Sequence, residues 1–170
     1  MITKDKLQEL HRRNWEWRAW MSKYTAFATP SNKDAIGWGV TEIGEAIEAG
    51  LDAKHIYDRN NPVERDDQAE QRRVHEELGD LAMDLLAALP PYYLMIENQF
   101  QDEPDLEIAL GEIMIHVANA YRCSRSTRMS PSYAREWSML ALYAIATYPG
   151  MDLERELESC WKRIKDKRTS

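Results

Sequence analysis

Residues 76–84 read Glu-Glu-Leu-Gly-Asp-Leu-Ala-Met-Asp and lie within a long stretch with a helical repeat. Apolar side chains recur there every three or four positions, as on one face of an α-helix: Val74, Leu78, Leu81 and Leu85. The pattern predicts one long helix from about Pro62 to Leu89, closed by the pair Pro90-Pro91. The acidic residues Glu77, Asp80 and Asp84 share a face beside this apolar stripe.

Similar spacing predicts further helices on both sides of this stretch, separated by glycine, proline and polar turns. Their expected ranges are 3–26, 32–50, 105–122, 131–148 and 152–167. The second should begin at a capping box formed by Ser31 and Asp34. Residues 92–101 fit a short helix or a strand, and the helical surroundings favour a helix. Because alternating strand patterns are essentially absent, we predict an all-α bundle of about five to six helices in one domain, 1–170.

Composition excludes several classes of protein. The 22 basic and 29 acidic residues give a formal net charge of −7, which argues against a nucleic acid polymer as partner. No apolar run approaches the ~20 residues of a membrane span, and no apolar segment follows the first charges as in a signal peptide. The two cysteines, Cys123 and Cys160, form no metal-type pair. A cytoplasmic location with reduced thiols is the expectation.

A second acidic helix carries a similar pattern, because residues 41–48 read Thr-Glu-Ile-Gly-Glu-Ala-Ile-Glu. Glu42 and Glu45 should project together with Trp38. The expected opposite side consists of Ile36, Val40, Ile43 and Ile47. A glycine inside a helix costs ~1 kcal/mol relative to alanine. Gly44 and Gly79 therefore suggest a close approach of two helices beside an acidic site.

Each of the two helices offers a pair of carboxylates three residues apart. If the helices pack side by side, the four residues Glu42, Glu45, Glu77 and Asp80 converge. Four crowded carboxylates need a compensating cation, and hard divalent ions such as Mg²⁺ prefer oxygen ligands. A single such pair is usually an ordinary solvated face. Two pairs, each around a helix glycine and each beside an apolar stripe, favour phosphate chemistry on a metal.

A third string of an apolar residue, glycine and an acid occurs at residues 110–112, after those at 43–45 and 78–80. One interpretation is a duplicated helix pair whose second copy has lost its chemistry. The other is coincidence among three-residue strings, and the sequence alone leaves both open.

The motif Glu42-x-x-Glu45 followed by Glu77-x-x-Asp80 resembles the signature of the all-α NTP pyrophosphohydrolases, which include MazG-like enzymes and dimeric dUTPases. The resemblance is best over residues 31–89 and resumes loosely over 157–165. It implies a MazG-like four-helix core with an extra or duplicated helix pair. It also implies Mg²⁺-dependent cleavage of a nucleoside triphosphate between its α and β phosphates, with Mn²⁺ as a substitute ion. Glu42, Glu45, Glu77 and Asp80 would be the ligands, and relatives suggest a homodimer or homotetramer.

The pattern offers several candidates for the residue that activates the attacking water. Many family members have a further Glu at the position occupied here by Thr41. Glu76, Glu48 and Asp84 are substitutes, and Glu76 is assigned with Glu42 and Glu45 to the catalytic group. Thr41 also keeps open a non-catalytic module that binds nucleotide or protein. A purely structural bundle with an acidic face is a further alternative.

A triphosphate also needs cations and a slot for the base. Eight of the 22 basic residues fall in residues 121–128 and 161–168. The assigned phosphate-binding residues are Arg122, Arg125, Lys162 and Lys165, although a basic helix end that complements the helix dipole is equally expected. Trp38 is the first choice for the base, whereas Trp15, Trp17 and Trp20 are expected in the core. The histidines do not cluster and no E-x-x-H occurs, which argues against a di-iron bundle.

Overall fold

The computed structural model describes residues 2–24, 31–55, 67–97 and 105–169, and this part of the chain contains six α-helices and no strand. The all-α prediction is confirmed. The helices are α1 (Lys4–Tyr24), α2 (Asn32–His55), α3 (Asp67–Ala88), α4 (Leu106–Arg125), α5 (Pro131–Ala146) and α6 (Leu153–Thr169). None of these helices is long and apolar enough to cross a membrane.

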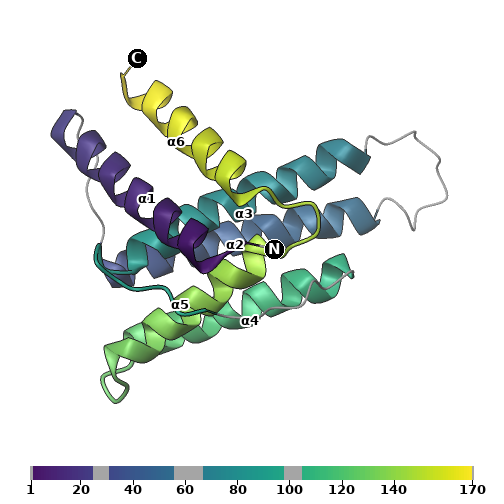
Figure 1. Ribbon diagram of the computed structural model, residues 1–170. Helices are drawn as coiled ribbons and strands as arrows, with labels where there is room; N and C mark the ends of the chain where they lie inside the picture. The colour runs from purple at the N-terminus through teal and green to yellow at the C-terminus, as the bar shows by residue number, and fades with distance from the viewer. Residues whose placement is uncertain (1, 25–30, 56–66, 98–104, 170) are drawn as a thin grey trace.

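The helices pack as a bundle around α3 (Figure 1). The most extensive contact is between α2 and α3, followed by that between α4 and α5. These two pairs pack on each other through α2 against α4 and α3 against α5. The outer helices α1 and α6 both contact α3, on the side away from α4 and α5 in Figure 1. Helix α3 is therefore central, and residues 78 to 89 along it are buried with the exception of Asp80, which is half-buried.

The capping box predicted for α2 is confirmed. The Ser31 hydroxyl accepts a hydrogen bond from the Asp34 backbone N–H at 3.2 Å and donates one to the Asp34 carboxylate at 2.6 Å. The expected end of α2 at Gly50 is wrong, because the helix continues to His55. Gly50 has no positive φ, and a Cβ there would lie 2.8 Å from Leu110 Cδ1. This glycine makes room for α4 and does not end α2.

The helix favoured for residues 92–101 is not formed in its described part, residues 92–97, and residues 98–101 lie outside the described chain. The segment begins in a turn, closed by a hydrogen bond from the Tyr93 N–H to the Pro90 carbonyl at 2.9 Å. Gln8 of α1 then binds two of its backbone groups: its amide donates to the Tyr93 carbonyl at 3.0 Å and accepts from Met95 N–H at 2.8 Å. These long-range bonds satisfy the backbone without a helix. The expected start of α3 at Pro62 also lies outside the described residues.

The predicted apolar stripe of α3, Val74 to Leu85, is buried as expected. On α2 the stripe is only partly right, because Val40 is 40% exposed. Gly39 takes the inner position instead, and a Cβ there would lie 3.0 Å from Leu81 Cδ1. Gly39, three residues before Glu42, thus makes room for Leu81 of α3.

The two motif glycines have different surroundings. A Cβ at Gly79 would lie 2.8 Å from Glu156 Cβ, so Gly79 allows α6 to approach α3 closely. A Cβ at Gly44 would meet nothing within 4 Å. The expected close approach is therefore found at Gly79, but the partner is α6, and it is wrong for Gly44.

Alanine substitutions at these glycines should have opposite effects on stability. Gly44→Ala should raise the free energy of unfolding by up to about 1 kcal/mol, because alanine favours the helix and the added methyl has space. Gly79→Ala should lower it by about 1–3 kcal/mol, because the methyl overlaps the root of the Glu156 side chain. Urea unfolding measures both values, and an unchanged or higher stability of Gly79→Ala would contradict the packing of α6 on α3.

Helix α1 covers α3 with a buried polar row that consists of His11, Asn14 and Arg18. The Asn14 amide donates to the Met83 carbonyl at 3.2 Å and accepts from the Trp161 indole N–H at 3.0 Å. Asn14 thereby links α1, α3 and α6. Among the tryptophans expected in the core, Trp20 is 39% exposed, which corrects that expectation.

Candidate metal centre

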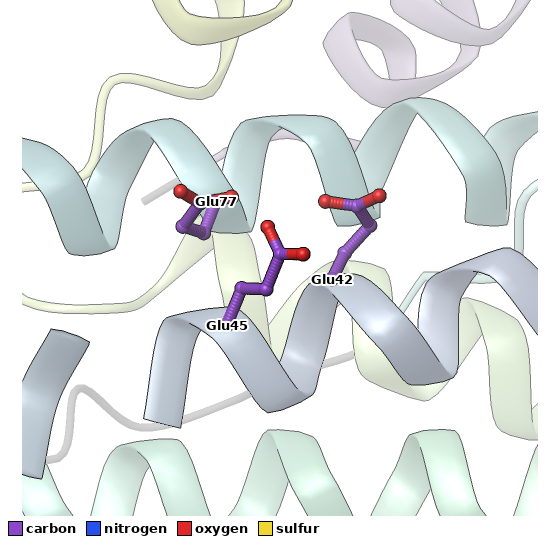
Figure 2. Close-up of side chains that lie close together, drawn as sticks. All are labelled: Glu42, Glu45 and Glu77. Atoms are coloured by element: carbon purple, nitrogen blue, oxygen red, sulfur yellow. The ribbon is translucent and has the colours of Figure 1, made fainter. Parts of the chain in front are cut away.

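Three carboxylates from two helices point toward one another (Figure 2). Glu42 and Glu45 come from α2, and Glu77 comes from α3. One carboxylate oxygen from each lies within 4.8 Å of the other two. The spacing of three residues places the α2 pair on one face, and the packing of α2 on α3 brings Glu77 opposite. The structure therefore brings together three of the four predicted ligands.

The fourth predicted ligand, Asp80, is bound by a side chain that the sequence analysis did not select. Arg163 of α6 donates a short hydrogen bond from Nη2 to Asp80 Oδ1. Its Nη1 lies 3.5 Å from Glu76 Oε2, so Arg163 bridges two acids one turn apart on α3. Asp80 is not part of the group formed by Glu42, Glu45 and Glu77.

No sequence signal singles out Arg163 among the five basic residues of 161–168. It lies seven residues after Glu156, hence on nearly the same face of α6. Glu156 is the residue that packs on Gly79. Only the packing of α6 on α3 at Gly79 shows that Arg163 reaches Asp80. Lys162 and Lys165, the residues selected on this helix, are both exposed.

Burial and mutual repulsion weaken the ionisation of the cluster. Burial, followed by the charges of Asp84 and Asp80 and then those of Glu45 and Glu77, raises the pKa of Glu42 to about 7. Burial also raises the pKa of Glu77, and repulsion by Glu45 adds to this. The charge of Arg73 on α3 lowers the pKa of Glu77, but it does not offset the other effects, and the pKa stays raised.

A buried ion pair lies behind the cluster. Arg18 Nη2 of α1 lies 3.3 Å from Asp84 Oδ1 of α3, and both side chains are buried. Burial raises the pKa of Asp84 to about 7, although the Arg18 charge lowers it. Asp84 in turn raises the pKa of Glu42. The pair and the cluster therefore form one electrostatic unit that connects α1, α3 and α2.

The donor set fits a hard divalent cation. All three converging groups are carboxylates, and Mg²⁺ and Mn²⁺ accept oxygen ligands of this kind. A cation between them would also offset the mutual repulsion that, after burial, raises the pKa of Glu42 and Glu77. Glu42, Glu45 and Glu77 are the residues that would hold it.

The alternatives for water activation occupy different positions. Thr41 and Glu48 are exposed on α2, whereas Asp84 is buried beside Arg18. Glu76 is exposed and paired with Arg163. Glu76 is therefore the substitute that remains accessible on α3 next to the cluster.

The predicted substrate-binding residues lie on three different helices, α2, α4 and α6. Trp38, 46% exposed, lies one turn before Glu42 on α2. Arg122 and Arg125 lie at the end of α4, and Arg125 Nη2 would be 3.4 Å from a Cβ at Gly37. The Lys165 ammonium of α6 lies 5.0 Å from the centre of the Trp20 ring. The structure thus places Arg125 beside α2, one residue from Trp38, and directs Lys165 toward α1.

Comparisons with known proteins identify no relative of this chain. It matches no family model, no curated protein and no solved structure. The resemblance to the all-α NTP pyrophosphohydrolases therefore rests on the motif residues themselves, and the structure adds the all-α fold and the convergence of Glu42, Glu45 and Glu77.

Proposed function

We propose that this chain is a Mg²⁺-dependent nucleoside triphosphate pyrophosphohydrolase of the MazG-like kind. It would convert a (d)NTP and water to a (d)NMP and pyrophosphate, as cytoplasmic housecleaning of the nucleotide pool. The observation that carries this proposal is the convergence of the Glu42, Glu45 and Glu77 carboxylates within 4.8 Å, in an all-α bundle. These residues belong to the motif that carries the family resemblance.

The roles of the chain's residues follow from their positions and charges. Glu42, Glu45 and Glu77 would hold the ion, and Asp80 is the fourth ligand that the motif supplies. When bound, Mg²⁺ would neutralise phosphate oxygens and lower the pKa of a bound water. Glu76 is the proposed proton acceptor, because it is exposed and precedes Glu77 on α3. A carboxylate in this role must lie within hydrogen-bond reach of the attacking water.

Substrate binding is assigned to residues around the cluster. Trp38 offers an exposed aromatic face on the helix that carries Glu42, suited to stacking on a base. Arg122 and Arg125 of α4 and Lys162 and Lys165 of α6 would supply positive charge to the phosphates. All four basic side chains are exposed, as required for contact with a soluble polyanion.

Self-association is part of the proposal. Helix α4 exposes Ile108 by 52%, Met114 by 45% and Ile115 by 54%. An apolar helix face of this kind is suited to burial in a homodimer or homotetramer. Light scattering should therefore give a mass two or four times 19.8 kDa, and a mass equal to one chain would contradict this part.

The activity is tested by a screen of pyrophosphate release. Canonical and modified ribo- and deoxynucleoside triphosphates are incubated with the full chain and Mg²⁺ or Mn²⁺. We expect pyrophosphate, and not orthophosphate, from at least one substrate, and no release with EDTA. Release of orthophosphate, or no release from the whole panel, would contradict the proposed reaction.

A non-catalytic nucleotide-binding or protein-binding module is the second candidate. Two observations favour it: Thr41 stands where a catalytic Glu is expected, and Arg163 already neutralises Asp80. Thermal unfolding separates the two functions for nucleotides. Stabilisation by nucleotide with Mg²⁺, without turnover of any substrate, would favour the binding module.

A further inference from the structure

The clearest unexplained contact near the carboxylates is made by Arg163. Its guanidinium binds Asp80 and approaches Glu76, while the remaining motif carboxylates face one another without it. The guanidinium is about one-third exposed, as is Asp80. Arg163 is therefore neither a core residue nor a free surface charge.

The fold directs α6 to this position. Gly79 allows the backbone of α6 at Glu156 to come close to α3. Leu157, Cys160 and Trp161 are buried and fix the helix. Arg163 then follows within one turn of Cys160, above Asp80. After Arg163, residues 165–169 are exposed.

We propose that Arg163 is an internal counter-ion of the candidate metal centre, which competes with a divalent cation for Asp80. This inference rests on the proposed function. In the metal-free protein Arg163 neutralises Asp80 and Glu76. When a cation binds to Glu42, Glu45 and Glu77, Asp80 leaves Arg163 and becomes the fourth oxygen ligand. The guanidinium is then available to the anionic group that the cation binds.

Because Arg163 and the cation compete for Asp80, each weakens the binding of the other to this carboxylate. A guanidinium at Asp80 withdraws one ligand and adds a positive charge near the cation, and both effects weaken metal binding. Removal of Arg163 should therefore tighten it. A side chain that only anchored α6 would instead affect stability, and would leave the metal affinity unchanged.

The test measures binding of Mn²⁺ alone to the full chain, by the electron paramagnetic resonance signal of free Mn²⁺ at pH 8. Arg163→Gln should lower the Kd for Mn²⁺ at least five-fold. Lys167→Gln is the matched control, because it removes the same charge one turn further along the same face of α6, where the side chain is exposed. Its Kd should stay within two-fold of the wild type.

A second pair of variants tests whether Asp80 is the group exchanged. In an Asp80→Asn background, Arg163→Gln should change the Kd for Mn²⁺ less than two-fold. A full five-fold effect in that background would overturn the exchange, because it would reflect only the general field of Arg163. Circular dichroism checks that each variant is helical.

The outcomes separate this inference from the proposed function. If wild type binds Mn²⁺ and Arg163→Gln binds it equally or more weakly, the counter-ion role is overturned and the metal centre remains. If neither protein binds Mn²⁺, both proposals fail. If Arg163→Gln does not fold, Arg163→Lys is measured instead, because lysine keeps the charge but loses the forked contact with the carboxylates. A Kd for Mn²⁺ two- to three-fold below that of wild type supports the exchange. An unchanged Kd overturns it.

Discussion

Glu77→Gln is expected to lower Mg²⁺-dependent pyrophosphate release at least about 100-fold, since even the loss of a group that only supports a metal ligand costs about 10–100-fold. Glu77 is the only member of the three-carboxylate group that comes from α3. Glutamine keeps the length of the side chain but removes the charge that attracts a divalent cation. The same variant should bind Mn²⁺ more weakly by a similar factor.

The stability of this variant separates a lost ligand from a damaged fold. Burial and the charge of Glu45 raise the pKa of Glu77, so its ionised form is disfavoured in the folded, metal-free protein. Glutamine removes this repulsion. The free energy of unfolding in EDTA should therefore be unchanged or higher, while activity falls.

Glu112→Gln is the matched control. Glu112 follows Gly111 on α4, as Glu45 follows Gly44 on α2, and both are exposed, but Glu112 is outside the three-carboxylate group. Its pyrophosphate release should stay within two-fold of wild type. Full activity of Glu77→Gln would show that the metal is held elsewhere, and equal losses in both variants would show a general effect of surface charge.

The central helices could be predicted from local patterns. The repeat of Val74, Leu78, Leu81 and Leu85 has the period of an α-helix, and the buried face of α3 follows it. The capping box at Ser31 marked the beginning of α2, because its hydrogen bonds involve only neighbouring residues. Segment 92–97 could not be predicted in this way, since Gln8, more than 80 residues away, binds its backbone.

The candidate site was predictable to the extent that helical spacing determines it. Glu42 and Glu45 share a face because they are three residues apart, and one helix contact suffices to bring Glu77 near them. The position of the Asp80 side chain could not be predicted, because its partner Arg163 lies on α6, about 80 residues later in the chain. Gly44 was misinterpreted because a helix glycine shows only that space is left, and only the fold shows whether another helix fills it.

Sequence patterns also could not predict that Arg18 is the buried partner of Asp84. Arg18 occurs in a helix with many charged residues, where an arginine is usually exposed. In the structure it is fully buried against α3. Asp84 likewise continues the acidic face of Glu77 and Asp80 in sequence, but it faces α1 instead of solvent. An ion pair between separate helices can be recognised only once their packing is known.

Arg18→Met is expected to lower the free energy of unfolding by about 3–5 kcal/mol at pH 8, the usual cost of removing one partner from a buried ion pair. Methionine fills most of the volume but leaves the Asp84 carboxylate buried without its counter-ion. Arg12→Met is the control on the same helix. Arg12 pairs with Glu16 on the surface, where both side chains are about 60% exposed, so its loss should cost less than about 1 kcal/mol.

The effect of Arg18→Met should depend on pH with a defined sign. Without Arg18, which lowers the pKa of Asp84, that pKa rises above its value of about 7 in the folded protein. An unfolded aspartate has a pKa of about 3.9. Between these two values the folded variant holds a proton that the unfolded chain has lost, so its stability falls as the pH rises. Wild type shows the same fall up to its own Asp84 pKa of about 7, so the two proteins diverge only above that pH. Urea unfolding should give a deficit relative to wild type that is larger at pH 8 than at pH 5, by up to about 1.4 kcal/mol, the linkage energy of one pH unit.

The double variant Arg18→Met with Asp84→Leu identifies the cause of this loss. When both charges are replaced by apolar groups, no buried charge is left unpaired, and most of the stability should return. The same variant removes the Asp84 charge that raises the pKa of Glu42. If the double variant is no more stable than Arg18→Met alone, the loss comes from packing of the arginine side chain, and the buried pair does not support α1 on α3 in the way its geometry indicates.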